Sequence, residues 1–361
     1  MANILLGIHP VFAGQRAIVL ASEEIRQVGP AALLTNDSPP PVPLDERVRL
    51  NPDQIEKVSN VVRDLPAADP FSFVSDYLPP VNDPHALDYF FAVTLQQFSF
   101  WEDDGRKYTI PLIAEIDGRS LKGSTYLYYA YTRKLRNDPL FFSPERQAKV
   151  TDVDLLEVFK ADDGTDPMPA LALHVEKSKQ YGTDMLAMGY TPEMMLVQAQ
   201  RSETPLKSFM MMLDHIGGYK EDPIRKKSDL LALCLDQRPE KFFRFGKNET
   251  VAPVVDYHCM RGCLRMGLID VLDVDLKKKL AGRELLAEDE EWAVRYAAYH
   301  IQEQVEILSG KHIGAVDWFF FNYMRSHCPE MTDPICAECA ADGMCAHRKE
   351  MFQPVLRTTF Y

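Results

Sequence analysis

The spacing of apolar residues along the chain predicts a protein built mainly from helices. After Asn51-Pro52-Asp53, apolar side chains recur every three or four positions, at Ile55, Val58, Val61 and Val62. This spacing gathers them on one face of an α-helix, and a proline in the first turn is typical of a helix start. The same argument predicts helices over 83–95, 124–135, 152–159, 168–179, 224–236, 257–268 and 289–308, and a further helix that starts at Thr191-Pro192-Glu193.

The N-terminal half also contains one stretch with the composition of β-structure. Residues 108–116 are rich in β-type side chains, and the Asp117-Gly118 pair that follows is typical of a turn. We expect this hairpin to be the only sheet-like part of the chain. Earlier in the chain, an amphipathic segment in residues 1–35 leads into a proline-rich run, 36–43, which favours an extended connector.

These patterns divide the chain into three predicted parts. An N-terminal α(+β) lobe, 1–150, carries the hairpin, and a helical lobe, 151–325, follows it. The last part, 326–361, is a short tail rich in cysteine. The predicted fold class is therefore mainly α, with a small β-hairpin or sheet in the N-terminal half and a metal-binding loop near the C-terminus.

The composition is that of a globular protein and limits the classes of partner. The 361 residues are 46% hydrophobic and 26% charged. Forty basic against 53 acidic residues give a net charge of −13, which argues against an extended surface for non-specific nucleic-acid binding. The N-terminus lacks the basic region of a signal peptide, and we expect no contact with a membrane. An odd number of cysteines, seven, fits a reducing compartment, so a cytoplasmic location is expected.

The strongest chemical signal lies in the tail. Cys328, Cys336, Cys339 and Cys345 form the pattern C-x7-C-x2-C-x5-C. Thiolates gathered in this way bind either a tetrahedral Zn²⁺ or an iron–sulfur cluster. Zinc sites with four thiolates usually contain two CxxC pairs, whereas this run contains one. The unequal spacing favours a [4Fe-4S] cluster, with Zn²⁺ as the alternative.

Aromatic residues concentrate just before the predicted hairpin. Phe98, Phe100 and Trp101 lie close together, Asp103 follows in an acidic loop, and Tyr126 lies in a tyrosine-rich helix. Aromatic clusters most often belong to a hydrophobic core. The functional interpretation is a platform on which a flat heterocycle stacks, with Asp103 or Tyr126 binding its edge or the attached sugar.

Lys226 and Asp256 stand out in the helical lobe. Asp256 follows the apolar run Pro253-Val254-Val255, where its carboxylate is expected to cap the next helix. Lys226 lies near the start of a predicted helix, and its simplest interpretation is a solvated lysine in the first turn. Both residue types also serve in catalysis when their surroundings shift their pKa, so both interpretations stay open.

The region of Asp256 and the tail together resemble the helix-hairpin-helix DNA glycosylase superfamily. The segment 254–268 is similar to the one that carries the catalytic aspartate there, and many members end in a four-cysteine [4Fe-4S] motif. In this chain the first spacer between cysteines is one residue longer. The lysine of that superfamily matches Lys226, with Lys227 as the alternative. The hairpin that grips DNA phosphate is missing, and only Gly217-Gly218 lies upstream.

The order of motifs over about residues 80–270 is more similar to the queuosine salvage family. The stretch 97–101 resembles its N-F-S-F-W-like motif, 123–126 its glycine-containing aromatic helix, and 226–231 its lysine helix. Asp256-Tyr257-His258 resembles its D-Y-R segment. The departures are Gln97 in place of Asn, Ser228-Asp229 in place of Ala-Gln, His258 in place of Arg, and the cysteine tail.

This resemblance implies an N-glycosylase that releases a modified, queuine-like 7-deazaguanine base from a nucleoside 5′-monophosphate. Asp256 would stabilise the oxocarbenium-like sugar or activate water, and Lys226 would position the sugar or its phosphate. The residues implied to bind the substrate are Phe98, Phe100, Trp101, Asp103, Tyr126, Lys227, Tyr257 and His258.

Two other functions stay open at this point. An iron–sulfur DNA-base glycosylase would take duplex DNA as its partner, which the net charge of −13 disfavours. A non-catalytic iron–sulfur binding protein on the same helical fold would need neither substrate. The expected partner is a small-molecule nucleotide.

Overall fold

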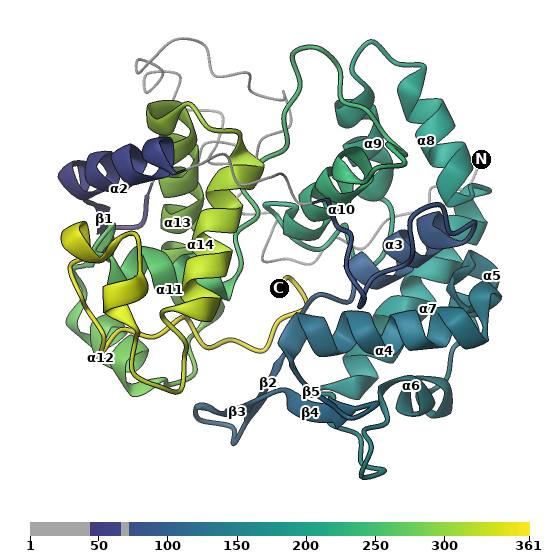
Figure 1. The fold of residues 1–361 in the computed structure, drawn as a ribbon, viewed down its shortest axis with the longest axis horizontal. Helices are drawn as coiled ribbons and strands as arrows, with labels where there is room; N and C mark the ends of the chain where they lie inside the picture. Colours follow the sequence, from purple (N-terminus) through teal and green to yellow (C-terminus); the bar gives the residue numbers. More distant parts are fainter. Residues whose placement is uncertain (1–43, 66–71) are drawn as a thin grey trace, which may run out of the picture.

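The structure, a computed structural model, describes residues 44–65 and 72–361. The predicted amphipathic segment, 1–35, and the connector, 36–43, therefore lie outside the described residues. Within the described ranges the chain forms thirteen α-helices and three two-stranded antiparallel sheets (Figure 1). The expected mainly α class is confirmed.

Most of the longer helices follow the predicted ranges closely. The α-helices are α2 (Pro52–Asp64), α3 (Ala86–Thr94), α4 (Gly123–Asn137), α5 (Pro144–Gln147), α6 (Asp152–Phe159), α7 (Leu171–Met188), α8 (Pro192–Gln200), α9 (Pro205–Leu213), α10 (Lys226–Gln237), α11 (Tyr257–Arg265), α12 (Val274–Gly282), α13 (Glu288–Ser309) and α14 (Ile313–Ser326). Short 3₁₀ turns are η2 (Pro139–Phe142), η3 (Cys336–Glu338) and η4 (Asp342–Met344). The strands are β1 (Val48–Leu50), β2 (Trp101–Asp103), β3 (Tyr108–Pro111), β4 (Ile113–Ile116), β5 (Arg119–Lys122) and β6 (Ile269–Val271).

Local capping explains where several helices begin. The Asn51 side chain accepts a hydrogen bond from the Gln54 N–H at the start of α2. Thr151 and Asp154 form a reciprocal capping box, and α6 has the bounds that the sequence predicts. The prediction for α7 is wrong at both ends, because the helix starts at Leu171 and continues to Met188.

The sheet prediction needs a correction. β4 and β5 form the expected hairpin around the Asp117-Gly118 turn, and β2 pairs with β3 beside it. The expectation that this is the only sheet is wrong, because β1 pairs with β6 and sets Arg49 opposite Asp270. Each of these strands has three residues, too few for a pattern of alternating polarity to be recognised.

The elements form two groups with the end of the chain between them (Figure 1). One group contains α2, α11, α12, α13 and α14, and the other contains α3 to α9 with the small sheets β2–β5. α2 packs on α13, so an early segment of the chain joins the later helices. The division at residues 150 and 325 stays a prediction.

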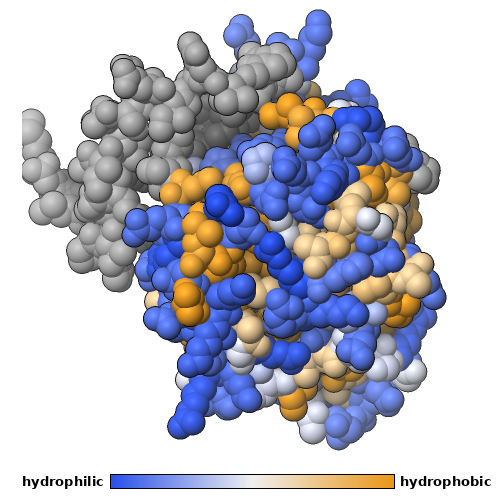
Figure 2. All heavy atoms as spheres, turned by 90° about the vertical axis from the view of Figure 1, so that its left-hand side faces the viewer, coloured by the Kyte–Doolittle hydropathy of each residue, from blue (hydrophilic) through white to orange (hydrophobic). Residues whose placement is uncertain are grey.

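One face of the molecule is mainly hydrophilic. Figure 2 shows the face at the left of Figure 1, where hydrophilic side chains predominate and apolar groups lie between them. None of the helices in the described ranges combines the length and the apolar composition that crossing a bilayer would require.

Candidate functional site

Asp256 caps the N-terminus of α11. Its Oδ1 accepts hydrogen bonds from the backbone N–H groups of His258 (2.8 Å) and Cys259 (3.0 Å). The buried run Val254-Val255 delivers the residue to this position, and the side chain itself is only part-buried. The capping interpretation is therefore confirmed. Because both bonds use one oxygen, capping leaves the carboxylate able to act on a reactant.

Lys226 is the first residue of α10 and is buried. Its exposed fraction is 5%, so the interpretation as a solvated lysine is wrong. Burial lowers the pKa of Lys226, while the carboxylates of Asp256 and Asp317 act to raise it. The structure thus brings Lys226 and Asp256 into electrostatic contact although they lie on different helices.

A buried ion pair supports the start of α10. Both oxygens of Asp222 accept hydrogen bonds from the Arg295 guanidinium, at 2.9 and 2.7 Å, and Asp222 Oδ2 also accepts from the Lys226 N–H. Arg295 lies on α13, and its guanidinium stacks over the rings of Phe360 and Tyr361. Sequence reasoning missed these residues because their partners lie far apart in the chain.

The end of the chain runs between the two groups of helices (Figure 1). Its carbonyl groups accept hydrogen bonds from Tyr108, Ser99 and Lys227. The Tyr361 hydroxyl donates to Glu291 on α13 at 2.7 Å. The tail therefore joins the aromatic segment before the hairpin to α10 and α13.

Lys227 is also buried, in different surroundings from Lys226. Its ammonium group donates to the carbonyls of Leu95 (3.0 Å) and Thr359 (2.7 Å) and lies 5.2 Å from the centre of the Phe98 ring. Burial lowers the pKa of Lys227 to about 7. These contacts link α10 to the C-terminal tail, and contact with a substrate stays a prediction.

The aromatic segment lies in the core. Phe98 is fully buried and stacks on the His174 ring at 4.2 Å, while Trp101 stacks on Tyr108 at 5.4 Å. Phe100 is buried as well. Core packing accounts for these positions, so stacking on a substrate stays a prediction for all three rings.

The polar residues beside that segment have partners within the protein. The Tyr126 hydroxyl donates to the Phe159 carbonyl at 2.8 Å, and Asp103 forms an ion pair with Arg357. Asp103 therefore anchors the C-terminal tail to β2. Whether either side chain also contacts a ligand stays a prediction.

Tyr257 and His258 begin α11 directly after Asp256. Their rings pack at 4.2 Å, and the Arg261 guanidinium contacts His258 Nδ1 at 2.9 Å. Burial lowers the pKa of His258 to about 4, so its ring is neutral at pH 7. Tyr257 is part-exposed and follows Asp256 directly in the chain. Of the predicted substrate-binding residues, it is the one that combines partial exposure with a position next to Asp256.

One face of α14 borders the same region and was missed by sequence reasoning. Asp317, Phe321 and Arg325 follow one another at intervals of four residues, the spacing of one helix face. Asp317 contacts Cys259, the Phe321 ring lies 5.2 Å from the His258 ring, and Arg325 donates to the Thr125 hydroxyl on α4 at 2.6 Å. The spacing was visible in the sequence, but nothing indicated which neighbours this face meets.

The four tail cysteines gather beside α11. Burial raises the pKa of the Cys345 thiol, and the charges of the Cys328, Cys339 and Cys336 thiols raise it further. Such mutual effects require the four thiols to lie near one another. The Arg265 guanidinium donates to Cys328 Sγ at 3.1 Å.

A second donor set overlaps this cysteine group. In the described part of the chain, Cys336, Asp342 and His347 have ligand atoms within 4.8 Å of one another. Nitrogen, oxygen and sulfur together suit Zn²⁺, whereas four thiols suit an iron–sulfur cluster or Zn²⁺. The tail thus has the residues for a metal site, and the kind of metal stays a prediction.

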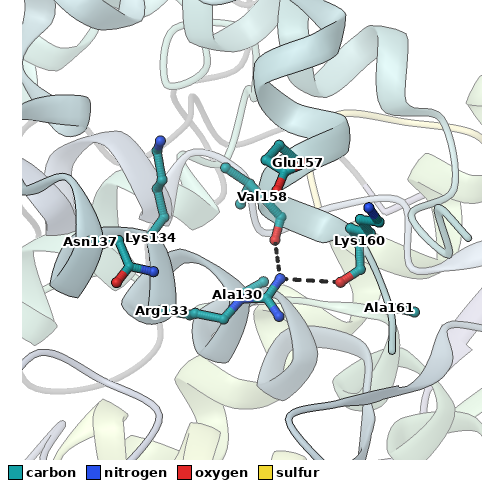
Figure 3. Close-up of a pocket in the computed structure, with 8 residues that line it drawn as sticks. All are labelled: Ala130, Arg133, Lys134, Asn137, Glu157, Val158, Lys160 and Ala161. Carbon is teal, nitrogen blue, oxygen red and sulfur yellow. Dashed lines mark hydrogen bonds between the residues drawn. The ribbon is translucent and has the colours of Figure 1, made fainter. Parts of the chain in front are cut away.

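Figure 3 shows a separate open cavity of about 380 Å³ between the ends of α4 and α6. Arg133 crosses it and donates to the carbonyls of Val158 (3.0 Å) and Lys160 (3.1 Å). These bonds satisfy carbonyl groups at the C-terminal end of α6. None of the predicted site residues is among those that line this cavity.

Comparison with known proteins identifies the family. A family model described as queuosine salvage protein matches residues 77–339. This chain belongs to the queuosine salvage protein family. No curated protein matched the chain.

The family match confirms one of the two predicted resemblances. The matched range includes Lys226, Asp256 and Asp317, and it ends at Cys339, inside the tail and before Cys345. The relation to helix-hairpin-helix DNA glycosylases and the iron–sulfur motif stay predictions.

Proposed function

We propose that this protein hydrolyses the N-glycosidic bond of a modified 7-deazaguanine nucleoside 5′-monophosphate and releases the base. Membership of the queuosine salvage family supports this class of substrate. The observation that carries the reaction type is the placement of a part-exposed carboxylate, Asp256, within the field of a buried lysine, Lys226.

Asp256 has the chemistry that the broken bond requires. Positive charge develops on the sugar as the base departs, and a fixed carboxylate beside it stabilises that charge or activates the attacking water. The two backbone N–H groups bound to Oδ1 hold the carboxylate in place before the substrate arrives. The carboxylate thus lies at the N-terminus of α11, where backbone N–H groups point towards it.

Lys226 positions the substrate in this proposal. An ammonium group within reach of Asp256 can bind a sugar oxygen or the 5′-phosphate, and the N-terminus of α10 adds backbone N–H groups that favour an anion. A nucleophilic role would be needed only for cleavage of a DNA strand after base release. The net charge of −13 disfavours such a duplex substrate.

The tail would hold a [4Fe-4S] cluster with a structural role. Cys328, Cys336, Cys339 and Cys345 would supply the four thiolates. The hydrogen bond that Arg265 donates to Cys328 Sγ would orient this thiolate and reduce its negative charge. Zn²⁺ on Cys336, Asp342 and His347 is the alternative, because these ligand atoms lie close together.

The test of this function is base release from a panel of substrates. Wild-type protein would be mixed with queuosine 5′-monophosphate, with the nucleoside lacking phosphate, and with duplex DNAs containing damaged bases, and the products separated by chromatography and detected by mass. Release from the monophosphate alone is expected. Release from DNA alone would contradict the proposal and favour the DNA glycosylase.

A further inference from the structure

Hydrolysis of the proposed substrate needs a proton donor as well as a carboxylate. The base leaves with the electron pair of the broken bond, and a general acid lowers the barrier by supplying a proton to it. A 7-deazaguanine carries carbon in place of N7, so the proton has to reach a nitrogen near the sugar, N3 or N9. Its donor must therefore lie close to Asp256.

Asp317 lies in such a place. Its Oδ1 accepts a hydrogen bond from the Cys259 thiol at 3.5 Å, and the Cys259 backbone N–H donates to Asp256 Oδ1 at 3.0 Å. Two carboxyl groups from different elements, α14 and the N-cap of α11, therefore bind the same residue. The side chain of Asp317 is buried but keeps 8% exposure.

The surroundings of Asp317 suit an aromatic leaving group. One turn further along the same face of α14, the Phe321 ring packs edge-on against the His258 ring, with an interplanar angle of 83°. The Tyr257 ring also packs against the His258 ring, at 4.2 Å, and Tyr257 is part-exposed. A flat base bound next to Asp256 would thus lie near aromatic side chains and the Asp317 carboxyl.

We propose that Asp317 is the general acid of this site and donates its proton to the departing base while Asp256 receives a proton from the attacking water. This inference rests on the function proposed above and adds the second group of the reaction.

The proposed step balances. The C1′–N9 bond breaks, its electron pair stays with the base, and the base takes the proton of Asp317 at N3 or N9. The water oxygen bonds to C1′ and its proton passes to Asp256. Asp256 then releases that proton to solvent and Asp317 takes one up, so the products are the free base and ribose 5-phosphate.

The protonation state of Asp317 supports this role. Burial raises the pKa of Asp317 to about 8, and the negative charge of Asp256 acts in the same direction. The Cys259 thiol and the Lys226 ammonium oppose the shift. Among the described residues, the charged or titratable groups that act on Asp317 are therefore Asp256 and Cys259, at the start of α11, and Lys226 on α10. Asp317 thus carries its proton at pH 7 and loses it as the pH rises through about 8, which is where a general acid works best.

A substrate pair separates acid catalysis from a structural role. The 7-deazaguanine base of the proposed substrate needs a proton in order to leave. The 4-nitrophenolate group of 4-nitrophenyl β-ribofuranoside 5′-phosphate leaves as a stable anion and needs no proton. Asp317→Asn keeps the shape and the neutrality of the protonated carboxyl. We expect it to lower kcat for queuosine 5′-monophosphate about 100-fold or more, with KM and the rate on the nitrophenyl substrate little changed.

The pH profile of the wild-type protein gives a second readout that needs no variant. Its kcat on queuosine 5′-monophosphate should fall above about pH 8, and this fall should be absent with the nitrophenyl substrate.

Three outcomes would overturn the proposal. Equal losses of Asp317→Asn on both substrates would show a positioning role, and no loss on either would show a structural one. A wild-type protein that cleaves neither substrate would refute the proposed function, and the general acid with it. Asp256→Asn should lose activity on both substrates. A wrong assignment of Asp317 as general acid can therefore be distinguished from a wrong proposal for the reaction itself.

Discussion

Arg261 and Glu330 form an ion pair of 3.3 Å in which neither side chain is exposed to solvent. Arg261 lies on α11, whose N-cap is Asp256, and it also donates to the carbonyl of Cys328 at 3.3 Å. Glu330 binds Lys122, the residue before α4, at 2.5 Å. One buried network thus connects the cysteine tail, the helix that holds Asp256, and the start of α4.

Replacing Glu330 with glutamine should destabilise the fold. The change leaves the guanidinium of Arg261 buried without its charged partner, which typically costs about 3–5 kcal/mol of unfolding free energy. Burial would raise the pKa of Glu330, but the charges of Arg261 and Lys122 outweigh it and lower the pKa to about 2. Denaturant unfolding at several pH values measures the effect.

The destabilisation caused by Glu330→Gln should depend on pH in a predictable direction. Since the folded-state pKa of Glu330 lies below its ordinary value of 4.5, the stabilisation is present above pH 4.5 and is lost as the pH falls towards about 2. The difference between wild type and Glu330→Gln should therefore narrow below pH 4.5. Asp76→Asn, which breaks the exposed pair with Arg119, is the matched control and should change little. Equal effects of the two variants would refute the role of the network.

Metal analysis of two variants distinguishes the two possible sets of metal ligands. Protein isolated without oxygen should contain iron and acid-labile sulfide in equal amounts, roughly four of each per chain. Cys339→Ser should abolish iron binding, while His347→Ala should keep it. Colourless protein with one zinc ion, lost in His347→Ala and kept in Cys339→Ser, would instead assign the site to Cys336, Asp342 and His347.

Tyr361→Phe should weaken the attachment of the C-terminal tail. The Glu291 carboxyl would lose its donor in a buried position, with an expected cost of about 1–3 kcal/mol in unfolding free energy. Burial raises the pKa of Glu291 to about 7, so the loss should be larger at pH 8, where the hydrogen bond is charge-assisted, than at pH 6.

A control for this variant is Tyr129→Phe, whose hydroxyl binds the more exposed carboxylate of Asp117 at 3.0 Å. A smaller and pH-independent change is expected there. If Tyr361→Phe had the same unfolding free energy as wild type at both pH values, the hydrogen bond between Tyr361 and Glu291 would not stabilise the fold.

Local signals explain what the sequence predicted well. The capping residues Asn51, Thr151 and Asp256 each bind a backbone N–H no more than three positions further along the chain. These helix starts could therefore be predicted from the local sequence. The four cysteines likewise form one short run. Sequence order alone also carried the family resemblance, because its motifs follow one another over a long stretch.

Burial and distant contacts explain what was missed. The simplest interpretation of Lys226 was a solvated lysine in the first turn of a helix. In the structure it is buried, and the charges of Asp222, Arg295 and Asp317, from separate elements, act on it. The chemistry of Asp317 depends on the packing of α14 against α11, which no local pattern encodes. The same holds for Tyr361, whose partner Glu291 is seventy positions away.

The most direct test of the central claim is the rate of base release from queuosine 5′-monophosphate by wild-type protein and by Asp256→Asn under single-turnover conditions. Asparagine caps helices as well as aspartate does, so the variant should fold and differ only in charge at the reacting sugar. We expect a rate about 100- to 1,000-fold lower for Asp256→Asn. Base release by Asp256→Asn at the wild-type rate would contradict the role proposed for the Asp256 carboxylate.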